Sequence, residues 1–303
     1  MSRTPLVSIV LPTVNAARTV ARTLTSLCMW LPLSEVEIIV VDGSSDKTPD
    51  IVQSYRPDVE LVRMEPGCAI PYLRGCGIAR ARGHIIALLD PYTRITRNWY
   101  STLCRLHREL PFAVIGGAVD PHPTTLRHRA SWWVYLAEYH AFMRPFPAGP
   151  VRDLAGNHVT YRREVLGDRT RFAREGFWKT LFNQELREHG HTLWCTPDLV
   201  VWVDKPIPPK DYLLDRFAHG RCFAARRAQH MSRPIRWMRA CMSPGVPWVL
   251  WIRQIRAMRS KRTDPGKWVQ SLPFLFACNT VWAWGELWGY IHGAGTSCHR
   301  LAY

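Results

Sequence analysis

The stretch Val36-Glu-Ile-Ile-Val-Val-Asp-Gly-Ser-Ser-Asp46 decides the fold. Its apolar run is nearly continuous rather than alternating, which predicts a strand covered on both faces, as in a parallel sheet. Similar runs occupy residues 7–11, 59–62 and 85–89, while residues 17–27 and 48–55 have helical periodicity. Strands that alternate with helices predict an α/β fold, with a mostly parallel sheet and helices on both faces.

Polar residues follow these strands where each one ends. Ligands of such sheets bind at the carboxyl ends of the strands, so these positions predict a binding cleft. A single Asp at a strand end is more often a turn former or a helix cap, but Asp42 and Asp90 end two separate strands. The residues expected at the cleft are Pro12, Thr13, Asn15, Asp42, Asp90 and Tyr92.

The composition excludes a disordered tail or a disulfide miniprotein, because 303 residues that are 47% hydrophobic can bury a full core. The nine cysteines fall at irregular spacings without a CxxC pair. We therefore expect free thiols in a reducing compartment and no structural zinc. The apolar residues 7–11 are too few for the core of a secretory signal, so we expect a protein on the cytoplasmic side.

The net charge of +16 is concentrated in one part of the chain. Fifteen basic and three acidic residues lie between Lys205 and Lys267. Within this region, residues 247–260 have the pattern of a basic amphipathic helix with Trp on its apolar side, which suits an anionic membrane or, alternatively, packing on its own domain. The aromatic-rich residues 272–291 follow, and their Pro273, Asn279 and Glu286 make them a poor spanning helix, leaving spanning, interfacial and re-entrant arrangements open. We expect a domain over residues 1–230 and a helical membrane-associated region over residues 231–303. Nucleic-acid binding would explain the arginines but not the apolar tail.

Several segments in order resemble glycosyltransferase family 2, the inverting sugar transferases of GT-A fold. They are Val7-Ser-Ile-Val-Leu-Pro-Thr-Val-Asn15, Glu37-Ile-Ile-Val-Val-Asp-Gly-Ser-Ser-Asp-Lys-Thr48 and Gly77-Ile-Ala-Arg-Ala-Arg-Gly-His-Ile-Ile-Ala-Leu-Leu-Asp90. Later segments are similar too: Asp153-Leu-Ala-Gly-Asn-His-Val-Thr-Tyr-Arg-Arg163, Glu175-Gly-Phe-Trp-Lys179 and Asp215-Arg-Phe-Ala-His-Gly-Arg221. The order of the motifs is more specific than any one of them.

The resemblance implies a nucleotide-sugar donor and a role for each segment. Asp42 would read the nucleobase or ribose, with Pro12, Thr13 and Asn15 shaping the pocket. Asp90 would hold Mg²⁺ or Mn²⁺ on the diphosphate, assisted by Arg74 as a second cation. The residues implied on the acceptor and diphosphate side are Gly156, Asn157, Trp178, Lys179, Arg216 and Arg221.

The chain departs from the family at several of these positions. The usual Asp-x-Asp is Asp90-Pro91-Tyr92, Asp204 stands where the family often has His, and Gly75 stands where Asn is common. Three interpretations stay open: a weakly bound metal, charge compensation by arginine, or lost catalysis. Preordered cations supply the same electrostatic stabilisation as a metal, so the second interpretation is chemically sound.

An inverting transfer also requires a base that deprotonates the acceptor hydroxyl. The acidic pair of the family falls at Trp178-Lys179 when the spacing is counted back from Gly190. Glu175 is the nearest upstream carboxylate, in a Gly-Phe-Trp loop expected to desolvate it, and Glu185 and Glu188 are the alternatives. The aromatic residues 132–143 are either an acceptor platform or core.

Two functions follow. The first is transfer of a sugar, with inversion, from a nucleotide donor to a lipid-linked or glycan acceptor at the cytoplasmic membrane face. The alternative is a catalytically degenerate GT-A domain that acts as a membrane-docked scaffold. The sequence leaves the sugar, the nucleotide, the acceptor and the oligomeric state open.

Overall fold

The computed structural model describes residues 4–229, 231–261 and 264–300. The chain forms two compact units, one of residues 1–122 and 146–204 and the other of residues 123–145 and 205–303. The boundary expected after residue 230 falls inside the second unit, whose role as a membrane-associated region stays a prediction.

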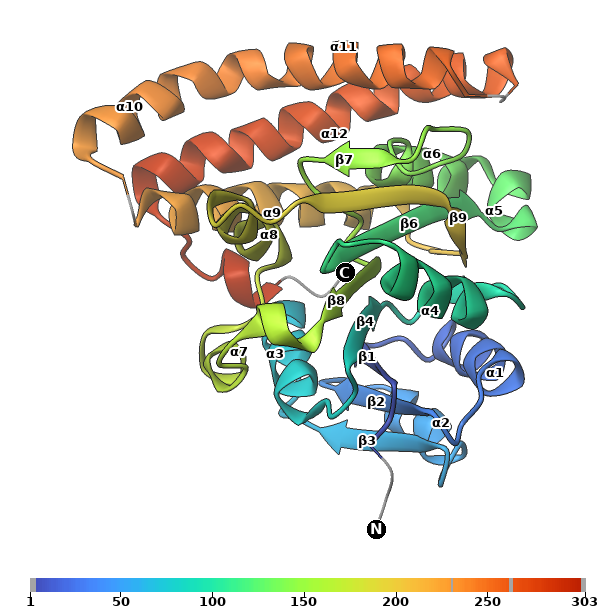
Figure 1. The fold of residues 1–303 in the computed structure, drawn as a ribbon. Helices are drawn as coiled ribbons and strands as arrows, with labels where there is room; N and C mark the ends of the chain where they lie inside the picture. Colours follow the sequence, from blue (N-terminus) through green and yellow to red (C-terminus); the bar gives the residue numbers. More distant parts are fainter. Residues whose placement is uncertain (1–3, 230, 262–263, 301–303) are drawn as a thin grey trace. The chain divides into compact units, whose positions relative to one another are not determined.

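The first unit contains one nine-stranded sheet in the order β3-β2-β1-β4-β8-β6-β9-β5, with β7 paired to β9. Its strands are β1 (Val7–Thr13), β2 (Val36–Asp42), β3 (Val59–Arg63), β4 (Ile85–Leu89), β5 (Thr93–Ile95), β6 (Val114–Pro121), β7 (Gly149–Val151), β8 (His158–Arg162) and β9 (Leu193–Val203). Its helices are α1 (Val20–Trp30), α2 (Thr48–Gln53), α3 (Ile70–Arg80), α4 (Trp99–Glu109), η1 (Arg163–Leu166), α7 (Thr170–Glu175) and α8 (Lys179–Glu188). In Figure 1, α3 and α7 lie on one side of this sheet and α1 and α4 on the other.

The four strands read from the sequence are parallel neighbours, as predicted. All residues of β1 and β4 are buried, in keeping with their continuous apolar runs and with helices on both faces. The sheet as a whole is mixed rather than mostly parallel, because β8 pairs antiparallel with both β4 and β6. This is a correction to the expected sheet, and it concerns strands that the hydrophobic pattern did not reveal.

The second unit is helical. It contains α5 (Pro123–Arg127), α6 (Arg129–Tyr139), α9 (Pro209–Ala228), α10 (Arg233–Met242), η2 (Ser243–Gly245), α11 (Val246–Arg259), α12 (Pro265–His292) and η3 (Ser297–Arg300). The helix predicted over residues 247–260 is confirmed as α11. The aromatic residues of α6 belong to the core: Trp132, Tyr135 and Tyr139 are buried, and Trp133 stacks on Phe274 of α12.

The aromatic-rich stretch forms most of α12, which packs closely along α9. A Cβ added to Gly220 would lie 2.1 Å from the Trp282 carbonyl oxygen, and one added to Gly285 would lie 2.2 Å from that of Phe217. The polar residues of α12 are paired within the unit, since Asn279 donates to Gln254 at 2.9 Å and buried Glu286 lies 3.8 Å from Arg227. In the parts of the chain that are described, no helix combines the length and apolar character needed to cross a membrane.

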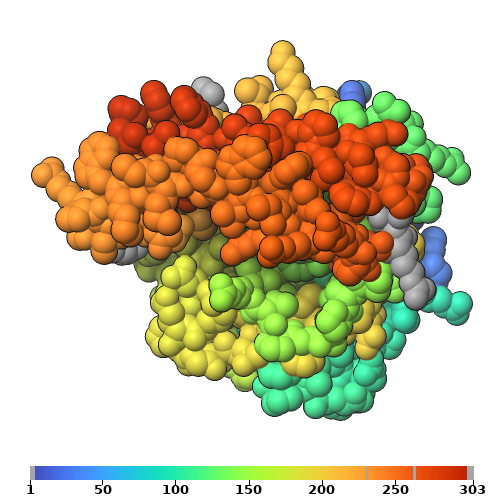
Figure 2. All heavy atoms as spheres, turned by 90° about the horizontal axis from the view of Figure 1, so that it is seen from above, coloured from blue at the N-terminus to red at the C-terminus, as the bar shows by residue number. Residues whose placement is uncertain are grey.

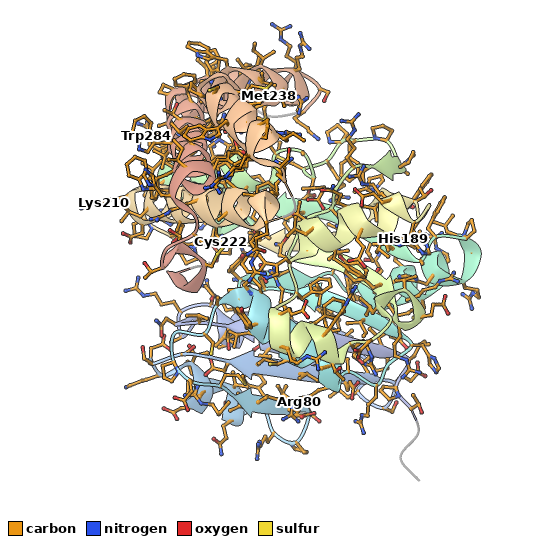
Figure 3. The ribbon with its side chains drawn as sticks, turned by 90° about the vertical axis from the view of Figure 1, so that its left-hand side faces the viewer. Arg80, His189, Lys210, Cys222, Met238 and Trp284 are labelled. Carbon is orange, nitrogen blue, oxygen red and sulfur yellow. A yellow bond between two sulfur atoms is a disulfide. The ribbon has the colours of Figure 1, made fainter. Side chains whose placement is uncertain are left out.

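A disulfide joins Cys222 of α9 to Cys298 of η3, with a Cα–Cα distance of 5.1 Å. Figure 3 labels Cys222 on its helix. The expectation that all nine cysteines are free thiols is therefore wrong for this pair. Two cysteines separated by 76 residues come together only through the packing of the helices, which irregular spacing in the sequence does not reveal.

Candidate donor and transfer site

The carboxyl ends of β1, β2 and β4 meet at one edge of the sheet, as predicted. β1 lies between the other two strands, Thr13 is paired in register with Asp42, and Asp90 follows the last residue of β4. Strands are about 4.8 Å apart, so β2 and β4 are separated by roughly 10 Å, which suits a nucleotide lying across the strand ends.

The first part of the site is a hydrogen-bonded frame around Asp42. Its buried carboxylate accepts hydrogen bonds from the Thr13 and Ser44 hydroxyls, each at 2.6 Å, and forms an ion pair with Arg63. Asn15, which has a φ of 49°, accepts a hydrogen bond from the Ser45 backbone N–H at 3.0 Å. Asp42 therefore ties the loops after β1 and β2 together, and its predicted contact with the base or ribose stays a prediction.

Two further residues at the strand ends belong to the same part of the site: Pro12, which was expected there, and Arg63, which was not. Pro12 is buried within β1, next to Thr13. Arg63, at the end of β3, was not among the expected residues; its position at the end of an apolar strand was the available signal.

The second part of the site is Asp90, which is buried and paired on both oxygens. Arg74 Nη2 lies 2.7 Å from Oδ1, and the Tyr92 hydroxyl donates to Oδ2 at 2.8 Å. The sequence prediction that Arg74, Asp90 and Tyr92 belong to one site agrees with this geometry. Tyr92, at the position of the missing second carboxylate, acts here as a donor to the first one.

Asp204 is likewise engaged by arginines. Arg22 lies 3.0 Å and Arg94 3.6 Å from its Oδ2. The backbone N–H of Asp204 donates to the Tyr92 carbonyl at 3.0 Å, which places this residue beside the Asp90 loop.

These side chains are a poor fit for a dedicated divalent-metal site. The charge of the single carboxylate at the motif, Asp90, is compensated by Arg74, and a guanidinium at 2.7 Å repels a second cation. Over residues 4–229, 231–261 and 264–300, no group of three or more His, Cys, Asp or Glu side chains is placed to hold a metal ion. We therefore assign no chemical step to a metal.

The third part of the site centres on Gly156 and Lys179. A Cβ at Gly156 would lie 3.6 Å from Arg74 Nη1 and 3.9 Å from Lys179 Cε, so two cationic side chains converge there. Asn157 is buried beside Gly156, and its Nδ2 lies 3.4 Å from the Thr93 hydroxyl. Three expected residues, Gly156, Asn157 and Lys179, thus lie next to Arg74 and the Asp90 loop.

Asp153 holds Lys179 in place and was not among the expected site residues. Its carboxylate accepts from Lys179 Nζ at 2.8 Å, the Thr180 hydroxyl at 2.9 Å and Asn183 Nδ2 at 2.7 Å. Burial alone would raise the pKa of Asp153, but the charge and hydrogen bond of Lys179, with the bonds from Asn183 and Leu154, hold it below its usual range. Asp153 is therefore a positioning anion and a weak base. The signal available in the sequence was Lys179 itself, which stands where the spacing places an acidic residue of the family.

Glu175 ends α7 and its side chain is exposed, so the expected desolvation by the Gly-Phe-Trp loop is not found. The Trp178 indole N–H donates to the Glu175 carbonyl oxygen at 3.0 Å, turning the ring back over the loop. Phe177, two residues after Glu175, donates its N–H to the carbonyl of Pro71 in the first turn of α3, one helical turn from Arg74.

The other two candidate bases are engaged on α8. Glu185 pairs with Arg171 at 3.1 Å, and Glu188 accepts from Gln184 at 2.8 Å. In the described part of the chain, neither a hydrogen bond nor an ion pair occupies the Glu175 carboxylate.

Gly75 departs from the family for a steric reason. A Cβ there would lie 1.9 Å from the Phe172 carbonyl oxygen and 2.5 Å from the carbonyl carbon. The backbone of α7 occupies the space that an Asn side chain would need, and this close approach brings the Glu175 loop onto α3.

Arg216 and Arg221 lie on α9 in the second unit. Arg216 is 3.3 Å from His219 Nδ1, and Arg221 donates to the Gly293 carbonyl at 2.9 Å, which fastens the end of α12. Their implied contact with the diphosphate stays a prediction.

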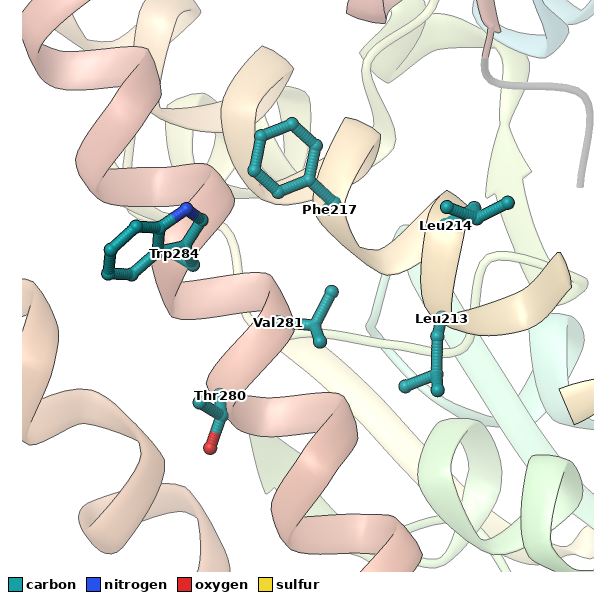
Figure 4. Close-up of a pocket in the computed structure, with 6 residues that line it drawn as sticks. All are labelled: Leu213, Leu214, Phe217, Thr280, Val281 and Trp284. Atoms are coloured by element: carbon teal, nitrogen blue, oxygen red, sulfur yellow. The ribbon is translucent and has the colours of Figure 1, made fainter. Parts of the chain in front are cut away.

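The second unit also has an apolar cavity of about 360 Å³ between α9 and α12. Figure 4 shows its lining, which carries no charged side chain: Leu213, Leu214, Phe217, Thr280, Val281 and Trp284. A nucleotide diphosphate does not suit such a cavity, whereas a hydrocarbon does.

A sheet with this order, polar residues at its carboxyl edge and convergent cations defines an α/β nucleotide-binding domain. Residues 8–170 match the description of Glycosyl transferase family 2, and the chain belongs to that family.

Comparison with a characterised relative supports this assignment. Over 158 residues the chain is 29% identical to validoxylamine A glucosyltransferase of Streptomyces hygroscopicus subsp. jinggangensis (strain 5008), a match that covers 48% of this chain and 34% of that protein. The match thus spans about a third of the relative.

Solved structures confirm the GT-A fold. The mannosyltransferase PcManGT of Pyrobaculum calidifontis, in complex with GDP-Man and Mn²⁺, has a TM-score of 0.57 at 16% identity, covering 91% of this chain and 86% of that one. S. aureus TarS 1–349 in complex with UDP-GlcNAc has a TM-score of 0.51 at 18% identity, covering 69% of this chain and 64% of that one.

Proposed function

We propose that this protein transfers a sugar, with inversion, from a nucleoside diphosphate sugar to a lipid-linked or glycan acceptor. The observation that carries the proposal is the convergence of Arg74 and Lys179 at Gly156, beside Asp90, at the sheet edge of a family 2 chain. A diphosphate leaving group develops negative charge as it departs, and two fixed cations in a partly buried site stabilise that charge.

The two cations are proposed to compensate the charge of the leaving diphosphate without a divalent ion. Lys179 Nζ is fixed by Asp153 and by the Leu154 carbonyl, so little reorganisation is needed when the diphosphate binds.

Glu175 is the proposed base. In the transfer step, the acceptor oxygen forms a bond to the anomeric carbon while the carbon–oxygen bond to the diphosphate breaks and its electron pair leaves with the nucleotide. The acceptor proton passes to the Glu175 carboxylate. Support comes from the position of the Glu175 loop on the first turn of α3 and from the engaged state of Glu185 and Glu188.

A lipid-linked acceptor is favoured over a free glycan. The apolar cavity between α9 and α12 suits the hydrocarbon of a lipid carrier, and two of its lining residues, Leu214 and Trp284, are 64% and 58% exposed, so the cavity opens to the surface. This acceptor would place the enzyme at the cytoplasmic face of a membrane.

The test combines nucleotide binding with turnover. Calorimetry should detect UDP or GDP binding in EDTA as well as in Mn²⁺, with the diphosphate bound more tightly than the monophosphate. Lys179→Met should reduce that preference roughly tenfold, the equivalent of about 1.4 kcal/mol. Binding of no nucleoside diphosphate would overturn the proposed function, whereas binding that requires Mn²⁺ would overturn only the role of the cations.

Turnover with the nucleotide sugar identified in this way tests the base. Glu175→Gln should lower kcat by about 10²- to 10⁴-fold, whereas Glu188→Gln should leave it unchanged. Asp90→Asn should also abolish turnover, with Asp58→Asn, on an exposed turn, as its matched control. An active Glu175→Gln enzyme would exclude Glu175 as the base. Nucleotide binding without turnover on any acceptor would favour the degenerate scaffold.

A further inference from the structure

The second unit presents an apolar outer surface on α10 and α11, here called the α10–α11 surface. Seven apolar side chains on these two helices are between 45% and 61% exposed. They are Ile235, Trp237, Met238, Met242, Trp248, Val249 and Ile252. Figure 2 shows the heavy atoms of these helices in orange, and Figure 3 labels Met238 on α10. So many large apolar side chains on neighbouring helices indicate a binding surface.

The same helices carry only positive charge. Residues 231–260 contain six arginines and no Asp or Glu. Five of the six are exposed: Arg233, Arg239, Arg253, Arg256 and Arg259. The partner of this surface must therefore be both apolar and anionic.

The two helices are anchored by their inner sides, which leaves the outer side available. Arg236 donates to the carbonyls of Tyr290 and Ile291 at the end of α12, and the Trp251 indole N–H donates to the Leu272 carbonyl at 3.2 Å. Gln254 and Met258 of α11 are buried. Packing thus fixes both helices against α12. Of the seven exposed apolar residues, Trp248 also takes part in this packing, with its ring centroid 4.8 Å from that of Phe276, and it remains 56% exposed.

We propose that the α10–α11 surface docks the protein onto an anionic lipid bilayer. Trp237 and Trp248 would enter the interfacial region with their aliphatic neighbours, while the arginines bind headgroup phosphates. The proposal adds the docking element to the proposed membrane location, and it does not depend on the donor chemistry.

Charge and shape distinguish this occupant from two others. A second copy of the same surface would bring arginines against arginines, which is repulsive. A nucleic acid would satisfy the arginines but leave Ile235, Val249 and Ile252 without an apolar partner.

The surface includes the helix of residues 247–260, for which the sequence had suggested an anionic membrane, and it adds the exposed apolar side chains of α10. The aromatic residues 272–291 were also expected in the membrane-associated region, but much of α12 is used in packing against α9. Docking through α10 and α11 requires no helix to cross the bilayer.

Vesicle flotation of the full chain tests the proposal, with vesicles of phosphatidylcholine alone and of phosphatidylcholine mixed with phosphatidylglycerol. The wild type should float with the anionic vesicles and only weakly with the neutral ones, and added salt should weaken its binding. Arg253→Gln combined with Arg256→Gln should weaken binding to anionic vesicles about 30-fold, from roughly fivefold for each arginine.

Matched controls separate surface effects from general ones. Met238→Ala with Met242→Ala should reduce flotation, whereas Met29→Ala, equally exposed on α1 of the first unit, should not. Arg108→Gln, exposed on α4, is the control for charge. Every variant should still bind the nucleoside diphosphate, so loss of docking is distinguishable from failure of the proposed function.

Any of the following results would overturn the proposal: equal binding of wild type and variants to anionic vesicles, no binding of the wild type to them, or salt-resistant self-association through this surface. Retention on nucleic acid that exceeds vesicle binding at moderate salt would do the same.

Discussion

Substitution of Gly75 by Ala tests whether α3 and α7 approach each other as closely in solution as in the structure. The added methyl group would lie 1.9 Å from the Phe172 carbonyl oxygen, whereas real Cβ contacts essentially never fall below 3.0 Å. The obstructing atoms are backbone, so α7 must move by on the order of 1 Å, because no side chain can rotate away.

The expected cost follows from two opposing effects. Overpacking of a close contact costs about 1–3 kcal/mol, and the rigid obstacle places this case at the upper end. Ala gains about 1 kcal/mol over Gly in a helix, which leaves a net loss near 2 kcal/mol. For a unit of the size of the first one, residues 1–122 and 146–204, that loss lowers the Tm by about 4–8 °C.

Scanning calorimetry of Gly75→Ala beside Gly149→Ala measures this effect. Gly149 lies in the same unit, has no heavy atom within 4 Å of an added Cβ and does not have a positive φ, so its substitution should change the Tm very little. Gly75→Asn, which restores the residue common in the family, should be worse than Gly75→Ala because it is larger. An equal Tm for Gly75→Ala and Gly149→Ala would refute the steric account.

Three further predictions concern charge and hydrogen bonding. Asp153→Ala should cost about 3 kcal/mol of unfolding free energy, because it leaves the largely buried Lys179 without its counterion. Glu185→Ala, which breaks an exposed pair with Arg171, should cost under about 1 kcal/mol. Equal losses in urea unfolding would contradict the anchoring role of Asp153. Asp215→Asn should raise the Tm by a few degrees at pH 8 and have no effect near pH 4. Burial, and then nearby Glu138 and Asp211, outweigh Lys205 and raise the pKa of Asp215 from 3.8 to about 7, so the stability of the wild type falls as pH rises through that window. A Tm difference between the two proteins that does not vary with pH would disprove this. Tyr92→Phe should raise the KM for the nucleotide sugar a few-fold and leave the fold intact. The substitution removes the hydroxyl that donates a hydrogen bond to Asp90 Oδ2, while Arg74 still holds Oδ1. An unchanged KM would show that this hydrogen bond has no part in binding the nucleotide sugar.

The sequence by itself determined the first half of the sheet and the strand ends that form the candidate site. Residues 36–41 and their three companion runs are almost continuously apolar, and this local property predicts strands covered on both faces. Asp42 and Asp90 follow two of these strands, so the parallel arrangement suffices to bring their loops to one edge. The helix of residues 247–260 was equally readable, because an amphipathic period is also local.

Only the tertiary structure decided the remaining features, because each depends on segments that are far apart in the chain. The antiparallel insertion of β8, the disulfide between Cys222 and Cys298 and the packing of α12 on α9 have no local signature. The burial of Glu175 could not be predicted from the sequence. Its loop was expected to desolvate the carboxylate, but the side chain is exposed. Asp153 and Lys179 are 26 residues apart, and their ion pair forms only when folding brings the two charges together. Neither residue alone therefore predicts it. Local periodicity specifies elements and the order of their ends, whereas ion pairs and close backbone contacts are set by three-dimensional neighbours.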